Sequence, residues 1–175
     1  MSYGTPVTTL QGANIPARVR TRDIREFTFL RGSGEVLPFL EAAGQSFNAG
    51  QWVVLNTSGL LVEAANAQDR VMGIALVDAT GVANSRIPVQ LATQDSIFRG
   101  VCLTPANLAQ TLVGDYVDLN VTAGVHRVSE SLSVQDVFQI VGFPDGATTY
   151  TSATFGQVDV RVVSTQVGQI AEEAL

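Results

Sequence analysis

The sequence contains no lysine, and its 175 residues include only one cysteine and one histidine. A single cysteine, Cys102, cannot form an intramolecular disulfide, and Cys102 and His126 together supply too few ligands for the common zinc sites. A phosphate-binding loop of the G-x-x-x-x-G-K type requires a lysine, and the G-x-G-x-x-G and G-x-S-x-G motifs are missing as well. We therefore expect no metal, no cofactor and no disulfide framework.

Charged residues are also scarce, at 15% of the chain against about 25% in an average globular protein. The formal net charge of −6 argues against nucleic-acid binding, because neutralising phosphates requires a basic surface. No apolar run approaches the roughly 20 residues of a membrane span, and the N-terminal segment lacks the basic-then-apolar order of a signal peptide. The sequence thus predicts a soluble, unexported protein whose largely neutral surface suits contact with other proteins.

Groups that could support catalysis are few. His126 lies in a predicted strand, where a general base is conceivable but a half-exposed structural histidine is the expectation. Asp115 and Asp118 are three positions apart in a predicted strand, so they point to opposite faces and do not form the carboxylate pair of a glycosidase. Cys102 lies in an apolar run and is expected to be buried. We expect no catalytic residues, no enzymatic activity and no small-molecule substrate.

Short runs rich in Val, Ile and Leu, separated by Gly, Asn, Asp and Ser, fill the chain from residue 36 onward. Their spacing is typical of strands and turns in a sandwich or barrel, and long 3.6-residue periodicity is missing. The predicted strands are 36–40, 51–56, 60–64, 71–77, 87–91, 96–103, 115–120, 125–129, 136–142 and 157–163. Short helical turns are expected at Thr104 and at 169–174. The predicted fold class is all-β, a compact small barrel or sandwich in residues 35–175.

Part of this region is repeated. Residues 50–56, GQWVVLN, match residues 114–120, GDYVDLN, and a turn containing glycine and a further strand follow each block. Later in each copy, VMGIALV at 71–77 corresponds to VFQIVGF at 137–143. A fixed order of similar blocks indicates duplication, and a chance alignment of β-rich sequence is the alternative.

From this repeat we infer two similar β-units, at about 44–100 and 109–163, that share one core. Trp52 and Tyr116 fall at equivalent places in the two copies. Each ring is large enough to plug one end of a small barrel, so both are predicted to be buried.

Residues 1–34 have a different character. They carry five arginines and two acidic residues, a net charge of +3, and few large apolar residues before Phe27. We interpret this segment as an extended N-terminal arm, in which alternate side chains project from one face about 7 Å apart. Such a ladder of arginines suits carboxylates on a partner's surface. The predicted partner-binding residues are Arg18, Arg20, Arg22, Arg25, Phe27, Phe29 and Arg31. A helix over 17–30 and a solvated tail are the alternatives.

The segment from about residue 36 to residue 100 also resembles a known family. The blocks that carry the resemblance are AGQWVVL at 49–55, GLLVEA at 59–64, VMGIAL at 71–76 and IPVQL at 87–91. Their cadence is similar to that of the small capsid decoration, or cement, proteins of tailed phages. The chain departs from that family by its greater length, its second β-unit and its arm.

The resemblance implies a virion structural protein that binds the major capsid protein on the outer capsid surface and stabilises the head. It further implies assembly in the host cytoplasm, often as a homotrimer, with an N-terminal segment that clamps neighbouring capsid subunits. The family supplies no catalytic residues.

Two other functions remain open at this point. A tail or neck component of the virion would have the same composition. A saccharide-binding β-barrel module is the alternative of another class, in which a sugar would lie between Trp52 and Tyr116. The scarcity of aromatic residues, 7% of the chain, counts against the saccharide reading.

Overall fold

The computed structural model describes residues 27–66, 68–104, 108–130, 135–144 and 156–165, and the fold is given for these ranges. They form eleven strands in two antiparallel sheets, with a sandwich-like arrangement in place of a closed barrel. The predicted all-β class is therefore confirmed. Of the predicted helical turns, the one at Thr104 runs into residues outside the described ranges and 169–174 lies wholly outside them. A 3-10 helix at Gln110–Leu112 follows instead.

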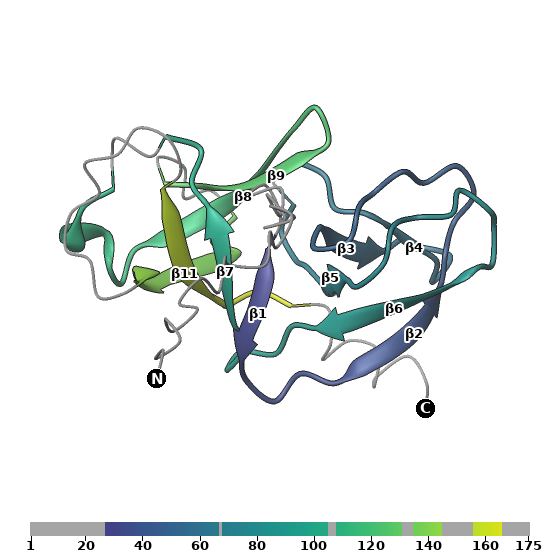
Figure 1. The fold of residues 1–175 in the computed structure, drawn as a ribbon, viewed down its shortest axis with the longest axis horizontal. Coiled ribbons are helices and arrows are strands. Elements are labelled where there is room, and N and C mark those ends of the chain that lie inside the picture. Colours follow the sequence, from purple (N-terminus) through teal and green to yellow (C-terminus); the bar gives the residue numbers. More distant parts are fainter. Residues whose placement is uncertain (1–26, 67, 105–107, 131–134, 145–155, 166–175) are drawn as a thin grey trace, which may run out of the picture.

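The five-stranded sheet has the strand order β2-β6-β5-β3-β4 and occupies the right half of Figure 1. The central strand β3, with the sequence WVVL, is buried at its first three positions, and its β-branched Val53 and Val54 pack well on a pleated surface. Its strands are β2 (Val36–Leu40), β3 (Trp52–Leu55), β4 (Leu61–Glu63), β5 (Gly73–Ala75) and β6 (Arg86–Leu91).

The six-stranded sheet has the order β1-β7-β11-β10-β8-β9 and occupies the left half of the same view (Figure 1). A tight turn joins β8 to β9, and its two central residues, Ala123 and Gly124, both have positive φ, at 51° and 68°. Two-residue hairpins favour this geometry because it matches the twist of the strands. The strands are β1 (Thr28–Arg31), β7 (Ile97–Val101), β8 (Tyr116–Thr122), β9 (Val125–Ser129), β10 (Phe138–Gly142) and β11 (Gln157–Val162).

The two sheets repeat one topology. Removal of β1 leaves the order β7-β11-β10-β8-β9, which matches β2-β6-β5-β3-β4 strand for strand. We call the residues of β2–β6 the first unit and those of β7–β11 the second unit. Two similar β-units therefore build the fold, but their bounds differ from the predicted 44–100 and 109–163. β2 (Val36–Leu40) belongs to the first unit, and β7 (Ile97–Val101) belongs to the second.

Strand pairing also aligns the units residue by residue. Trp52 lies opposite Ile74 in the first unit, and Tyr116 lies opposite Gln139 in the second. Ile74 thus corresponds to Gln139, whereas the sequence match paired it with Ile140. The match of 71–77 to 137–143 is wrong by one position, because similar apolar runs align equally well after a slip of one residue.

The expectation of one shared core needs correction, because the buried apolar residues form two clusters. The smaller cluster lies within the first unit and includes Phe47, Met72 and Ile87. The larger one fills the second unit and also takes in Trp52, Val54 and Ile74 from the first. The second unit therefore covers part of the first unit's sheet.

This arrangement gives the two repeat aromatics different surroundings. Trp52 is 0% exposed and packs against the rings of Phe27, Phe98 and Phe138, at centroid distances of 4.7 to 5.2 Å. Tyr116 is 48% exposed. The prediction of two buried plugs is thus right for Trp52 and wrong for Tyr116, because the face on which Tyr116 lies is not covered by another sheet.

The boundary of the arm at residue 34 is also corrected. β1 pairs antiparallel with β7, with Phe29 opposite Phe98. Phe27, just before β1, is 2% exposed, and its N–H donates to the carbonyl of Gly50 at 2.9 Å. A Cβ at Gly100 would lie 2.3 Å from the Phe27 ring, so this glycine makes room for the aromatic side chain. Residues 27–31 belong to the folded body.

Candidate partner-binding surface

The predicted partner-binding residues fall in two groups. Arg18, Arg20, Arg22 and Arg25 lie outside the described residues. Of the remaining three, Phe27 is buried in the larger cluster, Phe29 is partly buried against it, and Arg31 is exposed at the end of β1. Phe27 is therefore a core residue in this structure and is not available to a partner, which corrects its assignment. The alternating Phe27 and Phe29, predicted from the sequence to bind a partner, instead pack against the protein's own core.

His126 is a structural residue at the junction of the two units. Its side chain is 0% exposed, its Nδ1 accepts the Trp52 N–H at 3.1 Å, and its Nε2 lies 3.0 Å from Glu63 Oε1. Because Nδ1 accepts, the proton of the neutral ring is on Nε2 and is donated to the carboxylate. Burial lowers the pKa of His126, and the hydrogen bond and charge of Glu63 oppose that change only in part. The prediction of a half-exposed histidine is wrong, since the second unit's histidine reaches the first unit's backbone.

The buried carboxylates organise loops. Glu41 is 0% exposed and accepts hydrogen bonds from the Thr80 hydroxyl at 2.6 Å and from the Gly81 N–H at 2.8 Å. Burial by itself would raise the pKa of Glu41, but these hydrogen bonds outweigh it and lower the pKa. Asp118 Oδ1 accepts the N–H groups of Gln135 and Asp136, both at 2.9 Å. Both carboxylates thus bind backbone of their own chain.

Cys102 is buried, as predicted. Burial raises the pKa of its thiol, and the nearby charge of Glu130 raises it further. The thiolate form, which is the reactive one, is therefore disfavoured.

A saccharide held between Trp52 and Tyr116 does not fit this structure. Trp52 is fully buried among three phenylalanine rings, so it offers no face for a sugar to stack on. That assignment is corrected.

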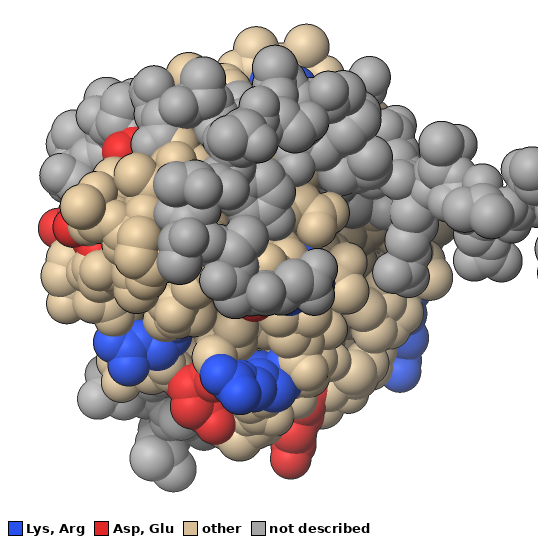
Figure 2. Space-filling view, turned by 60° about the vertical axis from the view of Figure 1, so that its left-hand side comes forward, with Lys and Arg blue, Asp and Glu red and all other residues tan. Residues whose placement is uncertain are grey.

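The outer face of the second unit is polar. Arg99 and Asp159 are opposite one another on β7 and β11 and form a two-pronged ion pair, Nε to Oδ1 at 2.7 Å and Nη2 to Oδ2 at 3.0 Å. Beside it, Arg161 donates to the side-chain oxygen of Gln139. Figure 2, which turns this half toward the viewer, shows acidic and basic side chains next to one another on a mostly neutral surface. Such paired charges are typical of a face that meets water.

The corresponding face of the first unit is mainly apolar, with the exposed Arg86 opposite Leu40 at one end. Alternate residues of β2, Val36, Pro38 and Leu40, share the face that points away from the smaller cluster. Pro88 lies opposite Pro38 on β6, and the Leu76 N–H donates to the Pro88 carbonyl at 2.9 Å, which continues the row. Val36 is 50% exposed, and Leu40 and Leu76 are each 42% exposed. We call Val36, Pro38, Leu40, Leu76 and Pro88 the apolar strip.

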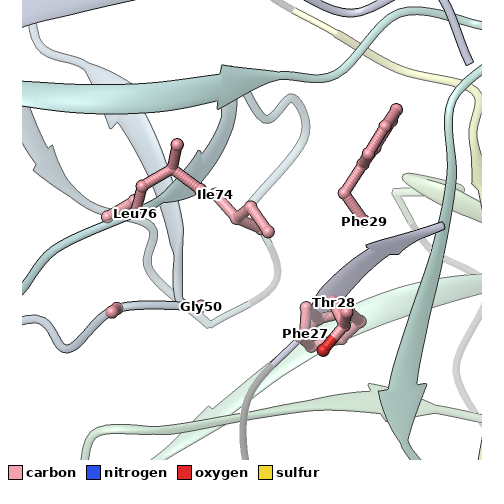
Figure 3. A pocket seen from close by; sticks show the side chains of 8 residues that line it. Phe27, Thr28, Phe29, Gly50, Ile74 and Leu76 are labelled. Atoms are coloured by element: carbon pink, nitrogen blue, oxygen red, sulfur yellow. The ribbon is translucent and has the colours of Figure 1, made fainter. Parts of the chain in front are cut away.

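At one end the strip leads into an open hollow of about 250 Å³ between β1 and β5. Figure 3 shows Ile74 and Leu76 on one side of the hollow and Phe29 on the other. The hollow and the strip together form a surface where apolar side chains are left exposed side by side.

Sequence reasoning missed the apolar strip, although a signal for it was present. The run Val36–Leu40 is apolar at all five positions, VLPFL, where a half-buried strand would alternate. A strand that is apolar on both faces is expected in the middle of a sheet, yet Pro38 places it at an edge. The combination indicates an edge strand with an exposed apolar face.

No protein-family model matches the chain, and a search of curated proteins found no match. None of the described helices is long and apolar enough to cross a membrane. Among the described residues, His, Cys, Asp and Glu side chains do not gather in any group that could hold a metal ion.

Proposed function

We propose that this chain is a non-catalytic virion structural protein, a capsid decoration (cement) protein that binds the outer surface of the major capsid protein shell and stabilises the head. The observation that carries the proposal is a contrast between the outer faces of the two units. The outer face of the first unit exposes the apolar strip, whereas the outer face of the second unit carries paired charges. An apolar face kept in one copy of a repeat favours a protein-binding role.

The location of the family-like blocks supports the same proposal. AGQWVVL, VMGIAL and IPVQL form β3, β5 and β6 with their flanking residues, so the resemblance falls on one folded unit. The buried carboxylates of Glu41 and Asp118 accept hydrogen bonds from loop N–H groups of the same chain, which favours a structural role over catalysis.

In this proposal the arginines of the arm contact the capsid. Phe27 fixes the arm's attachment point, since its ring is held in the core and its N–H binds Gly50. The segment before it carries Arg18, Arg20 and Arg22, and each charge-assisted contact with a capsid carboxylate contributes about 1.5–3 kcal/mol at a partly desolvated interface.

The experiment is a binding titration of purified, undecorated capsids with three proteins. The full chain is expected to saturate the capsids. A chain without residues 1–26, and full-length protein with Arg18, Arg20 and Arg22 all changed to Ala, are expected to need at least about a hundredfold higher concentration, because several charge-assisted contacts are lost. Arg127→Ala, which also removes an arginine but lies in β9, is the control and should bind like the full chain.

Failure of the full chain to bind capsids would overturn the decoration proposal. Equal saturation by the full and truncated chains would instead leave the decoration role and remove the arm from it. A tail or neck component is the second candidate, and mass spectrometry of purified empty heads separates the two, because only a decoration protein should be abundant there.

A further inference from the structure

The β8–β9 hairpin of the second unit contacts the first unit through three sets of hydrogen bonds. The Gln51 side chain donates to the Gly124 carbonyl, and the Val121 N–H donates to the Asn66 side chain at 3.0 Å. The third set is at His126, and of the three it is the one that includes ionisable side chains. These contacts between the units therefore depend on pH through His126.

The surroundings of the His126 ring determine what a second proton does there. Among the described residues, the charged side chain in contact with the ring is Glu63 of β4, 3.0 Å from Nε2, and on the other side Nδ1 accepts the Trp52 N–H at 3.1 Å. Arg127, the next residue of β9, points to the opposite face of the strand, and Val121, opposite His126 on β8, is uncharged. Because Nε2 already carries the proton of the neutral ring, a second proton binds at Nδ1 and faces another donor.

These two donors cannot separate unless the units move. The Trp52 N–H belongs to the backbone of β3, which pairs with β4 and β5 in the first unit. His126 is 0% exposed and belongs to β9, which pairs with β8 in the second unit. Each donor is thus fixed by the sheet of a different unit, and relief of the repulsion requires the hairpin to move away from β3.

The same movement affects the start of β1. Phe27 contacts both units, since its ring packs against Trp52 at 5.2 Å and Phe138 at 5.9 Å and its N–H donates to the Gly50 carbonyl. The strand that follows Phe27 pairs with β7 of the second unit. Separation of the units therefore takes Phe27 away from Trp52 and Gly50 and leaves β1 on the second unit.

We propose that the junction between the units is a pH-sensitive switch, in which protonation of His126 moves the β8–β9 hairpin and Phe27 away from the first unit while both sheets stay intact. The ring is neutral in the closed form, and it is protonated and in contact with water in the open form. Burial lowers the pKa of His126 in the closed form, so a falling pH favours the open form. This inference concerns the chain itself and holds whether or not the protein binds capsids.

The test is amide hydrogen exchange of the full chain, measured by NMR between about pH 7.5 and pH 5 and corrected for the intrinsic exchange rate at each pH. The Trp52 and Phe27 amides should lose protection by about tenfold for each pH unit below 6.5, the largest response that one proton allows. Amides in the β2–β6 and β1–β7 pairings should stay more protected at every pH, because the sheets remain intact. Equal protection at the junction and in the sheets would mean that the whole protein unfolds at once, which overturns the proposal.

Two variants identify the group that titrates. His126→Asn keeps an uncharged acceptor and should abolish the response, with circular dichroism showing that the variant is folded. Glu63→Gln removes the carboxylate and should keep the response, since the proton binds to the ring. Glu35→Gln, the same change at an exposed residue before β2, is the matched control and should behave like the parent.

Three results with these proteins would overturn the proposal. The first is a parent chain whose junction amides keep their protection down to about pH 5. The second is a response that survives in His126→Asn, and the third is one that disappears in Glu63→Gln, because either would show that a group other than the imidazole takes up the proton.

Discussion

At the scale of single residues, the junction between the units depends on His126. Its imidazole is the only histidine ring of the chain, and it joins the β3 backbone at Trp52 to the Glu63 carboxylate on β4. A second proton on the ring would occupy Nδ1, which now accepts the Trp52 N–H, so protonation removes that hydrogen bond and sets two donors against each other. The contact between the units therefore requires the neutral ring.

This requirement makes stability depend on pH. The pKa of His126 is lowered in the folded chain from its ordinary value of 6.5, so the unfolded chain takes up the proton first as the pH falls. The contribution is fully present above 6.5 and is lost progressively as the pH falls toward the lower folded value. We expect the free energy of unfolding, measured with urea, to decrease between about pH 7.5 and pH 5.

His126→Asn is the control for this prediction, because the amide stays uncharged and can still accept a hydrogen bond. It should be less stable than the parent at neutral pH but nearly insensitive to pH over the same range. Glu41 also has a lowered pKa, but its contribution to stability is lost near and below its ordinary pKa of 4.5. It therefore affects a lower pH range than His126 does. A variant with the parent's pH slope would show that another group titrates.

Trp52 and Tyr116 give a second prediction at this scale. Trp52→Ala should cost about 3–5 kcal/mol, because a fully buried ring leaves a cavity between the units. Tyr116→Ala should cost less than about 1 kcal/mol, since the ring is about half exposed. The measurement is the unfolding midpoint in urea, and equal losses at the two positions would contradict the difference in burial.

At the scale of elements, all ten predicted strands are present, and two of them, 36–40 and 125–129, have the predicted bounds. Length and flanking turn residues were enough to find these strands. β1 was not predicted as part of the sheet, because nothing local to Thr28–Arg31 says whether an extended segment pairs with its own chain or another. That choice is made by the edge of β7 and by the space at Gly100, both far away in sequence.

The same limit applies to the candidate surface. Each residue of the apolar strip could be identified as apolar in the sequence, but burial of such residues is the usual outcome. Their exposure follows from the strand order, which leaves β2 at an edge and lets the second unit cover only the β3 and β5 side of the sheet.

A truncation pair tests the place of β1. Loss of residues 1–26 should leave a cooperatively unfolding protein of nearly full stability, because the two buried clusters are already extensive among the residues that the structure describes, which begin at Phe27. Loss of residues 1–31 should cost at least about 3–5 kcal/mol, since it removes the buried Phe27 ring and the pairing of β1 with β7. Urea unfolding of both chains measures the difference. Equal stability would mean that β1 contributes nothing to the body.

At the scale of the whole molecule, the two units share one topology but have different surroundings. The first unit is held between its own cluster and the second unit's core, while the second unit carries paired charges on its outer face. Equivalent positions of the two units share a topology and a solvent. A difference in residue type between them therefore reflects a difference in the contacts that they make. The repeat thus separates the residues that the shared topology requires from those that depend on the surroundings of each unit.

The position of Trp52 between the two units has a consequence for folding during synthesis. The first unit leaves the ribosome before the second. Until residues 98, 126 and 138 have followed, Trp52 lacks two of the three phenylalanine rings that pack against it and the histidine that accepts its N–H. The nascent chain therefore carries an incompletely covered tryptophan while about half of its length is made, during which it is open to chaperones and to mispairing. Trp52 is the only tryptophan in the chain, so its transfer from solvent into the core reports when the two units pack together.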